Sequence, residues 1–485
     1  MEFAETEVTV VGAGAAGLYT ALSAAREGGH VLLVSATPLA ESSSYWAQGG
    51  LAAALSAEDN PERHLADTVT AGRGAVRKSA ARILCEEAPL AVDDLARLGV
   101  NFDADRTGRL ALGLEGGHSA RRIVHAGGAA TGRRIVGRLS ALVSAHPRID
   151  VLESRRVISV AAVDRRAVGA ALDDGTTIAS RAVVLATGGA AALWARTTNP
   201  PGATGGGLLL AYRAGAALAD LEFLQFHPTA VVAPVGDGLL VTEAVRGEGA
   251  RLLDSSGRRF VDELAPRDEV ARAVHRQMTL TGSASVDLDM RGIDPALFPT
   301  VFSALRRAGI DPERELVPVA PAAHYMMGGV ATDLNGCSTI AGLYAVGECS
   351  CTGLHGANRL ASNSLSECFV FGSRAARAAL AEPEVDTSLL AESVSLQRPE
   401  PAPPLAPASR EALWRRAGLE RDRRGLEQLV ADPHPLVRLI AAAAITRTET
   451  RGAHQRRDFP DTDPDLAEIH VTIATGSDPA LASWA

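Results

Sequence analysis

The hydrophobic pattern near the amino terminus predicts a buried β-strand that leads directly into an α-helix. Residues 7–11 alternate and then become continuously apolar with β-branched side chains, which is typical of a buried parallel strand. Residues 18–26 repeat their apolar side chains at helical spacing, and residues 30–34 form a second short apolar run. This order of elements indicates the start of a Rossmann-like α/β domain.

The turn between the first strand and the helix has the spacing Gly-x-Gly-x-x-Gly. In this strand–turn–helix context the spacing is typical of a dinucleotide site, because Gly12 permits a tight turn and Gly14 lets the backbone approach a pyrophosphate. The alternative is a glycine turn without a ligand. The second strand ends at Ser35, where an acidic residue that binds the ribose often lies. The sequence of this turn therefore leaves the identity of the nucleotide open. We expect cofactor contacts from Gly12, Ala13, Gly14, Ala15, Ala16, Gly17 and Ser35.

The rest of the pattern predicts a nucleotide-binding domain that is interrupted by a second domain. Residues 150–186 indicate an antiparallel excursion, and residues 342–348 indicate a strand that returns to the first sheet. Between them the pattern mixes strands, hairpin turns and helices, one of which should begin at Asp294-Pro295 and end at Gly309. We expect a discontinuous nucleotide-binding domain at 1–220 and 326–395, an inserted α+β domain at 221–325, a proline-rich linker at 396–408 and a C-terminal helical domain at 409–485.

Composition narrows the classes of function. A net charge of -9 over 485 residues argues against nucleic acid or an anionic membrane as the main partner, and no apolar run approaches the ~18 residues of a membrane span. The five cysteines are odd in number and form no Cys-x-x-Cys pair, so we expect neither a disulfide framework nor a metal site. The acidic amino terminus leads directly into a strand without a signal peptide, which favours a cytoplasmic protein.

Nine motifs occur in an order that resembles one known group of enzymes. They are the glycine turn and residues 47–50, 186–189, 225–229, 242–249, 264–268, 322–325, 347–348 and 355–365. Together they resemble the flavoprotein family of succinate dehydrogenases, fumarate reductases and L-aspartate oxidases. The resemblance implies FAD as cofactor, a flavin domain interrupted by a capping domain, and a dicarboxylate held between the two.

Two stretches look like the aspartate-oxidising members of this family. These are residues 115–119, which begin with Glu115, and residues 359–365, which begin with Arg359; the dehydrogenases usually carry Phe-Gly-Gly and Gly-Gly-Asn-Ser-Leu there. Membrane-bound relatives attach their flavin through a histidine at the position of Ser43, so the resemblance implies noncovalent FAD. It further implies oxidation of L-aspartate to iminoaspartate by hydride transfer to flavin N5, with oxygen or fumarate as electron acceptor. That reaction begins quinolinate and NAD synthesis, which implies a functional link to quinolinate synthase.

The resemblance also assigns roles to individual residues. Arg267 matches the family's catalytic arginine, and Glu115 would face the substrate ammonium group. The substrate-binding residues would be Glu115, His227, Thr242, Glu243, His324 and Arg359. Besides the glycine turn and Ser35, the FAD contacts would be Ser43, Ser44, Tyr45, Trp46, Ala47, Gln48, Gly49, Gly50, Thr187, Gly188, Gly189, Glu348, Ser364 and Leu365.

Three departures and two alternatives qualify this interpretation. Ala36, Ala129 and Gly206 replace a lysine and two aspartates that are common in the family, so we expect looser FAD binding. One alternative is a soluble fumarate reductase or succinate dehydrogenase-type flavoprotein. The other is a flavin-binding scaffold without catalysis.

Overall fold

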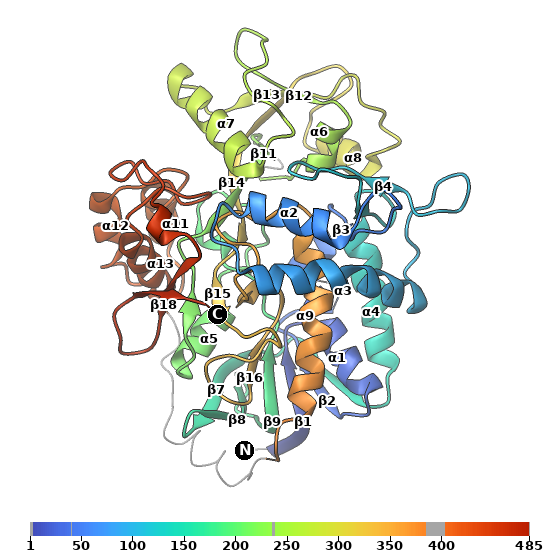
Figure 1. Cartoon of the computed structure of the whole chain (residues 1–485), viewed down its shortest axis with the longest axis vertical. Coiled ribbons are helices and arrows are strands. Elements are labelled where there is room, and N and C mark those ends of the chain that lie inside the picture. Colours follow the sequence, from blue (N-terminus) through green and yellow to red (C-terminus); the bar gives the residue numbers. More distant parts are fainter. Residues whose placement is uncertain (1–2, 40, 235–237, 385–402, 485) are drawn as a thin grey trace.

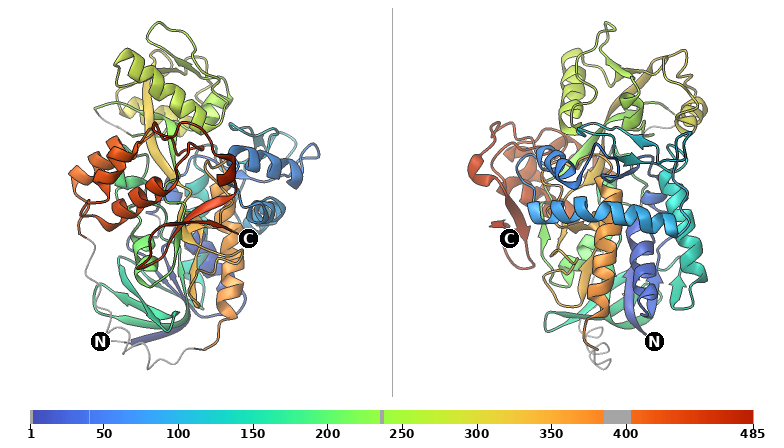
Figure 2. Two further views of the ribbon diagram at one scale, coloured as in Figure 1. Left: turned by 60° about the vertical axis from the view of Figure 1, so that its left-hand side comes forward. Right: turned by 45° about the vertical axis from the view of Figure 1, so that its right-hand side comes forward.

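The computed structural model describes residues 3–39, 41–234, 238–384 and 403–484. The molecule is elongated, with a large α/β body at the amino-terminal end, a second sheet with its helices at the opposite end, and the C-terminal segment along one side (Figures 1 and 2). No helix in the described ranges is long and apolar enough to cross a bilayer.

The α/β body is built on a seven-stranded sheet. Six of its strands have the order β6-β2-β1-β9-β8-β7, and the seventh, β16, pairs with β9. Strands β6, β2, β1 and β9 pair with one another in parallel, whereas β8 pairs antiparallel with both β9 and β7, which is the antiparallel excursion that the sequence predicts. Strand β16 pairs with the carboxyl-terminal half of β9, so the chain returns to this sheet as expected. The bounds are β1 Phe3–Val11, β2 Val31–Val34, β6 Ile149–Leu152, β7 Val157–Val163, β8 Arg166–Leu172, β9 Thr177–Leu185 and β16 Leu343–Ala345.

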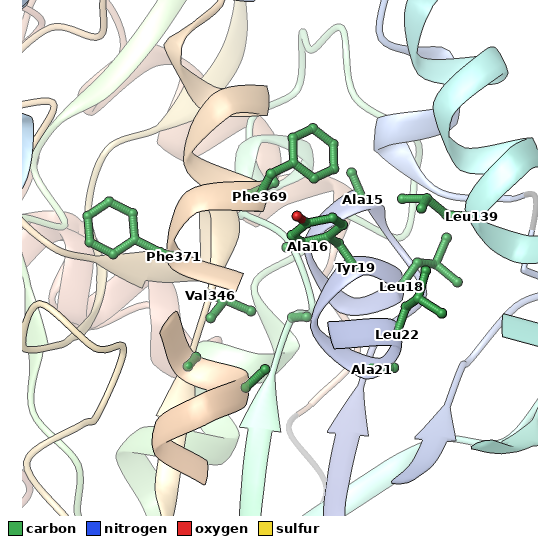
Figure 3. Close-up of a cluster of buried hydrophobic side chains, with 14 of the residues drawn as sticks. Ala15, Ala16, Leu18, Tyr19, Ala21, Leu22, Leu139, Val346, Phe369 and Phe371 are labelled. Atoms are coloured by element: carbon green, nitrogen blue, oxygen red, sulfur yellow. The ribbon is translucent and has the colours of Figure 1, made fainter. Parts of the chain in front are cut away.

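Helices α1 (Ala15–Arg26), α4 (Thr131–Ala145) and α9 (Asn363–Leu380) share one hydrophobic core against this sheet. Figure 3 shows Leu18 and Leu22 of α1 beside Leu139 of α4, and Tyr19 beside Phe369 of α9. The Tyr19 and Phe369 rings meet edge to face with centroids 5.1 Å apart. This packing fixes the start of α1, and therefore the glycine turn, against α9.

Helices α2 (Pro61–Ala71) and α3 (Lys78–Arg97) lie across the body beneath the second sheet (Figure 1). The Asn60 side chain accepts the Arg63 N–H and Pro61 opens α2, which is a typical helix start. The two helices are separated by a break at residues 72–77. Nearby lie the short elements η1 Ser43–Trp46, β3 Leu51–Ala52, β4 Leu112–Gly113 and β5 Ile123–Val124.

The second sheet has the order β11-β14-β13-β12 and belongs to the inserted segment. Its elements are β11 Leu224–Val231, α6 Glu243–Gly247, β12 Arg251–Leu253, α7 Arg267–Thr281, β13 Val286–Asp289, α8 Pro299–Arg307 and β14 Val317–Met326. The predicted start of α8 at Pro295 is wrong. Residues 294–298 form a separate turn in which the Asp294 side chain accepts the Ala296 N–H, because Phe298 precedes a proline and is pushed out of the helical region (φ -132°, ψ 52°).

The C-terminal segment is only partly helical, which corrects the expectation of a helical domain at 409–485. The predicted helices between 409 and 448 are present as α11 Pro407–Arg416, α12 Arg423–Leu429 and α13 Pro435–Thr446. After them β18 pairs with β10, which lies some 250 residues earlier, and completes a five-stranded sheet with the order β17-β15-β10-β18-β19.

The remaining bounds are η2 Ala191–Leu193, α5 Gly206–Arg213, β10 Leu218–Ala219, β15 Gly329–Ala331, η3 Gly347–Cys349, β17 Ser350–Cys351, η4 Pro464–Leu466, β18 Ile469–Ile473 and β19 Ala480–Ser483. Most of the predicted linker at 396–408 lies outside the described residues.

Candidate active site

The turn between β1 and α1 has the shape that a pyrophosphate requires. A Cβ added to Gly17 would lie 1.9 Å from the Gly12 carbonyl oxygen, and one added to Gly12 would lie 2.3 Å from the Ala186 oxygen. Only glycine therefore lets α1 start so close to the ends of β1 and β9. The first turn of α1 carries neither a capping side chain nor an acidic residue, so its amides are open to an anion.

A second loop, here called the flavin loop (residues 43–50), packs on the start of α4. Gly132 of α4 donates its N–H to the Ala47 oxygen (3.0 Å), and a Cβ on Gly132 would lie 1.9 Å from the Ser44 oxygen. The Gln48 amide nitrogen donates to the Leu240 oxygen of the inserted segment (3.1 Å), while its buried Oε1 has no hydrogen-bond partner in the described structure. Such an orphaned polar atom fits a site that a polar cofactor completes.

The remaining predicted cofactor residues lie at the carboxyl ends of the strands or at the start of α9. Thr187 and Gly189 follow β9, and the Thr187 hydroxyl is buried without a partner in the described ranges. The Glu348 carboxylate lies against Gly189, accepts the Met326 N–H (3.0 Å) and has its pKa raised to about 7 by burial. Ser364 and Leu365 lie in the first turn of α9, Ser35 follows β2, and Trp46 stays 65% exposed. Nucleotides bind at the carboxyl ends of the strands in open α/β sheets, so the positions that follow β2 and β9 suit such a cofactor.

Arg267 is the first residue of α7, and its guanidinium is fixed by two buried partners. Its Nε donates to Glu243 Oε2 (2.6 Å) and its Nη1 donates to Gln225 Oε1 (3.2 Å). Burial pushes the pKa of Glu243 up, but Arg267 and Arg246 outweigh it and hold that pKa below its ordinary value. The other Glu243 oxygen accepts the Gly116 N–H (3.0 Å), which ties the loop after Glu115 to the same carboxylate.

Arg359 approaches the same centre from the loop before α9. Its Nη2 donates to Gln225 Oε1 (3.0 Å), so one amide oxygen receives both Arg267 and Arg359. The guanidinium also lies over the Tyr325 ring, 4.5 Å from its centroid, and its buried Nε has no hydrogen-bond partner within the described residues. Burial lowers the pKa of Arg359 to about 10, which leaves it charged at neutral pH.

His227 of β11 and His324 of β14 face each other with ring centroids 5.0 Å apart. Burial, with Arg267 adding to it, lowers the pKa of both imidazoles far below the ordinary value, so both are neutral. His227 Nδ1 accepts the Thr229 N–H (3.3 Å), which places the proton of the neutral ring on the buried Nε2. That Nε2 has no partner in the described structure and is a donor available to a ligand.

Glu115 is buried and faces the flavin loop. Its Oε2 accepts the Ser362 hydroxyl (2.6 Å), and a Cβ on Gly49 would lie 3.7 Å from its Oε1. Ser362 has a left-handed backbone (φ 61°) at the start of α9, a conformation that is rare for a residue other than glycine and often retained at functional sites. Thr242 lies beside Glu243 as the residue that precedes α6. All seven predicted catalytic and substrate-binding residues thus come together at one centre.

The comparisons with known proteins point in the same direction. The FAD binding domain family matches residues 7–365, and the fumarate reductase flavoprotein C-terminal family matches residues 426–481. The chain is 46% identical to an L-aspartate oxidase of Caulobacter vibrioides, with 97% of each chain covered. It is 41% identical to an L-aspartate oxidase of Streptomyces coelicolor, with 98% of this chain and 92% of the relative covered. The chain belongs to the L-aspartate oxidase family.

The fold agrees with this membership of the L-aspartate oxidase family. An E. coli quinol fumarate reductase structure superposes with a TM-score of 0.90 at 26% identity, covering 99% of this chain and 96% of that chain. FAD is the cofactor, and it is held noncovalently. The structure therefore supports the predicted α/β fold with a C-terminal domain.

Sequence reasoning left three polar residues of this L-aspartate oxidase family site without a role. Gln225 orients both arginines, Arg246 lies 3.7 Å from Glu243, and Ser362 donates to Glu115. Two signals could have found them: Gln225 opens the 225–229 motif, and Arg246 follows Glu243 by three residues on the same helical face. Ser362 lies in the 359–365 motif, but its contact with Glu115 spans 247 residues and could not be derived from that motif.

Proposed function

We propose that the protein catalyses the FAD-dependent oxidation of L-aspartate to iminoaspartate, the first step of quinolinate and NAD synthesis. The observation that carries the proposal is the buried Glu115 carboxylate, which lies beside Gly49 of the flavin loop and in the same centre as three arginines. An ammonium group is what a buried carboxylate pairs with, and among succinate, fumarate and aspartate only aspartate carries one.

The charges of the centre match this substrate. Here the charged cluster means Glu115, Glu243, Arg246, Arg267 and Arg359, which together carry one net positive charge. Aspartate carries one net negative charge, so it neutralises the cluster, whereas succinate or fumarate would leave one negative charge in excess. Buried charges are stable only when they are paired, which favours aspartate.

FAD, when bound, supplies the flavin N5 that accepts the hydride from the substrate α-carbon. The chain itself holds the substrate in one orientation. Arg359 presents an unpaired buried Nε and His227 presents a proton on Nε2, and both can donate to substrate carboxylates. We assign the ammonium group to Glu115 Oε1, because Oε2 already accepts the Ser362 hydroxyl.

Arg267 is the proposed catalytic residue. Two hydrogen bonds, to Glu243 and Gln225, restrict its guanidinium, so its charge stays fixed relative to the substrate during the reaction. The proton that the substrate nitrogen loses would pass to Glu115 Oε1, which faces that nitrogen. His227 and His324 stay neutral and act as hydrogen-bond partners, and we assign Thr242, which precedes α6, to substrate binding as well.

A flavin spectrum tests the proposal. Under anaerobic conditions L-aspartate should bleach the oxidised flavin band, while succinate and D-aspartate should leave it nearly unchanged. After acid precipitation all yellow colour should stay in the supernatant, since Ser43 cannot form a histidyl bond. Equal bleaching by succinate would favour the alternative of a soluble fumarate reductase or succinate dehydrogenase, and a flavin that no dicarboxylate reduces would favour a scaffold.

We further propose oxygen or fumarate as the electron acceptor and a functional link to a quinolinate synthase, which would consume the imine. The proposed compartment is the cytoplasm, where the five cysteines, all free thiols in the structure, would stay reduced. Cell fractionation, and oxygen uptake compared with fumarate consumption, would test these assignments.

We also propose that residues 221–325 cap the site. The hydrogen bond from Gln48 of the flavin loop to Leu240 of this segment supports the proposal.

A further inference from the structure

The position of Arg267 depends on the start of α7, and Arg73, which lies outside the inserted segment, contacts that start. Arg73 lies in the loop between α2 and α3, and its Nε and Nη2 donate to the two carboxylate oxygens of Asp268, each at 3.0 Å. Asp268 directly follows Arg267, and its side chain is 2% exposed. This bidentate pair fixes both distance and angle, which a single charge contact does not.

Arg73 is itself held in an unusual conformation. Its backbone is left-handed (φ 56°), a conformation that is unfavourable for a residue with a side chain. Its carbonyl oxygen accepts the Arg451 Nη1 hydrogen (2.7 Å) from the C-terminal segment. The strained backbone thus coincides with a contact on each side, one to α7 and one to the C-terminal segment.

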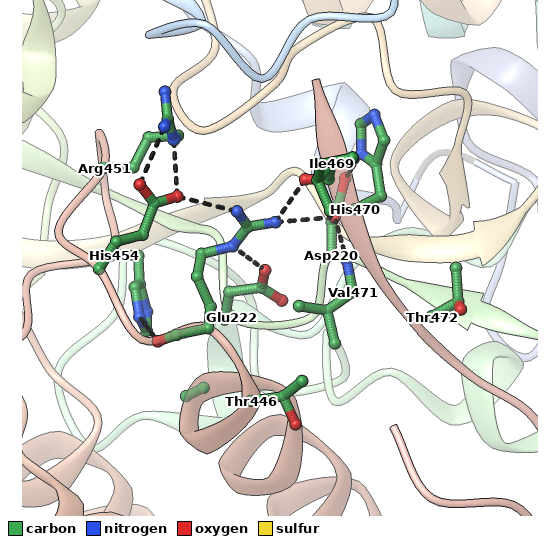
Figure 4. A network of polar contacts seen from close by, with 12 residues as sticks. Asp220, Glu222, Thr446, Arg451, His454, Ile469, His470, Val471 and Thr472 are labelled. Atoms are coloured by element: carbon green, nitrogen blue, oxygen red, sulfur yellow. Dashed lines mark hydrogen bonds and ion pairs between the residues drawn. The ribbon is translucent and has the colours of Figure 1, made fainter. Parts of the chain in front are cut away.

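Arg451 is in turn fixed by a buried network of charges. It forms two hydrogen bonds with Glu449, at 2.7 and 2.8 Å, and Glu449 also pairs with Arg447, which pairs with Glu222 (2.7 Å). Figure 4 shows Arg451 at one end of this network and Asp220 with His470 at the other. Because Glu449 and Arg447 are fully buried, Arg451 has little freedom to move.

A small cavity separates part of α7 from the C-terminal segment. Its volume is about 10 Å³, and its lining includes Gln225, Ala271, Arg272 and Gln455. On this side α7 is bridged by polar contacts, such as Arg272 to Gln455 (3.1 Å).

We propose that Arg73 is a positioning residue for Arg267, through which the C-terminal segment sets the geometry of the active site. Arg451 fixes the Arg73 carbonyl, Arg73 fixes Asp268, and Asp268 fixes the first turn of α7. The inference rests on the proposed function, since it assumes that Arg267 acts in aspartate oxidation.

Single and double variants of the FAD-loaded enzyme test the inference. Arg73→Gln should lower kcat for L-aspartate about tenfold or more, with KM changed by less than about threefold, because a displaced Arg267 affects the transition state more than binding. Arg73→Lys keeps the charge but loses the fork, so it should recover only part of kcat. Should Arg73→Gln fail to fold, Arg73→Lys carries the same test. The matched control is Arg82→Gln, since Arg82 pairs with Glu62 across α2 and α3 on the exposed surface (2.6 Å).

The decisive measurement repeats Arg73→Gln in an Arg267→Lys background. Arg267→Lys alone should lower turnover well over tenfold, and Arg73→Gln should then add almost nothing. An unchanged kcat in Arg73→Gln, or an equal fold loss in both backgrounds, would overturn the positioning role while the proposed function stands. If the wild-type enzyme does not oxidise aspartate, the proposed function itself fails, and if Arg267→Lys is fully active, the catalytic role of Arg267 fails.

Discussion

At the scale of single residues, Gln225 determines how the two principal arginines lie. Its Oε1 accepts from Arg267 and Arg359, and its Nε2 donates to Asn358 Oδ1 (2.9 Å) and the Arg359 oxygen (2.8 Å). Every polar atom of this amide is therefore used, and the amide cannot flip without losing these bonds. An uncharged side chain thus holds two like charges in one centre.

Glu115 is the residue that should separate aspartate from other dicarboxylates. Glu115→Gln keeps the shape of the side chain but removes its charge, and a lost charge-assisted contact is worth about 1.5–3 kcal/mol. This lost contact alone should lower kcat/KM for L-aspartate about tenfold to about 150-fold, and the loss of the proton acceptor should add to it. Fumarate reduction by the reduced flavin should stay unchanged or improve, because a dianion then no longer meets a carboxylate.

Both activities should be measured on one preparation with its FAD content. The matched control is Glu248→Gln, an exposed glutamate close in sequence to Glu243, which should leave both activities unchanged. If Glu115→Gln lowers aspartate oxidation and fumarate reduction in parallel, Glu115 only supports the turn at Gly116 and does not recognise the ammonium group.

Glu348 makes a prediction about pH. Burial raises its pKa to about 7 in the FAD-free protein, whereas an unfolded glutamate titrates near 4.3. The raised pKa means that its contribution to stability is complete below about pH 4.3 and is lost as pH rises through about 7. In Glu348→Gln this loss should disappear, so the variant should gain about 2–3 kcal/mol over wild type between pH 5 and pH 8.

Urea unfolding of both FAD-free proteins at the two pH values measures this gain. Glu222, whose pKa burial also raises, is present in both proteins and cancels in the difference. A difference between variant and wild type that stays constant with pH would show that Glu348 is ionised in the folded protein at pH 5.

At the scale of elements, the sequence predicted best where one local pattern decides the structure. The strand, glycine turn and helix at residues 3–26 follow from hydrophobic spacing and from three glycines that close approach requires. The predicted start of α8 was wrong because Asp294-Pro295 resembles a helix start, whereas a second proline, Pro299, keeps the residue before it out of the helical conformation. Strand β18 was missed because its partner β10 has only two residues and lies far away in the chain.

In the candidate site, too, local sequence motifs could be predicted and contacts between distant segments could not. Residues in family motifs, such as His227 and Arg359, could be predicted as a set, but their partners could not be derived from spacing. The contacts of Ser362 with Glu115 and of Gln225 with Arg359 join segments that only the folded chain brings together. The sequence therefore predicted the chemistry of the site better than the way in which it is held.

The start of helix α5 carries a prediction about cofactor affinity. Gly206 is its first residue, is exposed, and has no atom within 4 Å of an added Cβ, so a side chain fits there without strain. Gly206→Asp would restore the carboxylate that is common in the family at this position. A charge-assisted hydrogen bond of about 1.5–3 kcal/mol should tighten FAD binding about tenfold or more.

Fluorescence titration of the FAD-free protein measures this affinity, and Gly206→Asn is the control without charge. The Asn variant should gain less than the Asp variant. If neither variant binds FAD more tightly, the glycine-rich start of α5 does not face the cofactor.

At the scale of the whole molecule, buried charges join the C-terminal segment to the body. Arg447 lies between Glu222 and Glu449, and all three side chains are fully buried. Arg447→Met would leave the buried Glu222 carboxylate without its ion-pair partner and Glu449 with Arg451 alone, which should lower the free energy of unfolding by about 3–5 kcal/mol. Arg423→Met removes only an exposed pair with Glu427 and should cost less than about 1 kcal/mol.

Denaturant unfolding of both variants at saturating FAD gives the comparison. A similar small loss in both would mean that the carboxylates around Arg447 are neutral in the folded protein, which would agree with the raised pKa of Glu222.

The way in which the chain passes into and out of the second sheet has a consequence for how the protein could change over evolution. Strands β11 and β14 pair with Leu224 opposite Met326, so the segment between them begins and ends at neighbouring points. Its length can therefore vary at small entropic cost without altering the spacing of the body below, since loop closure depends only weakly on loop length. His227 and His324 lie on the paired strands themselves, so relatives could lengthen or shorten residues 232–316 and keep both imidazoles in place.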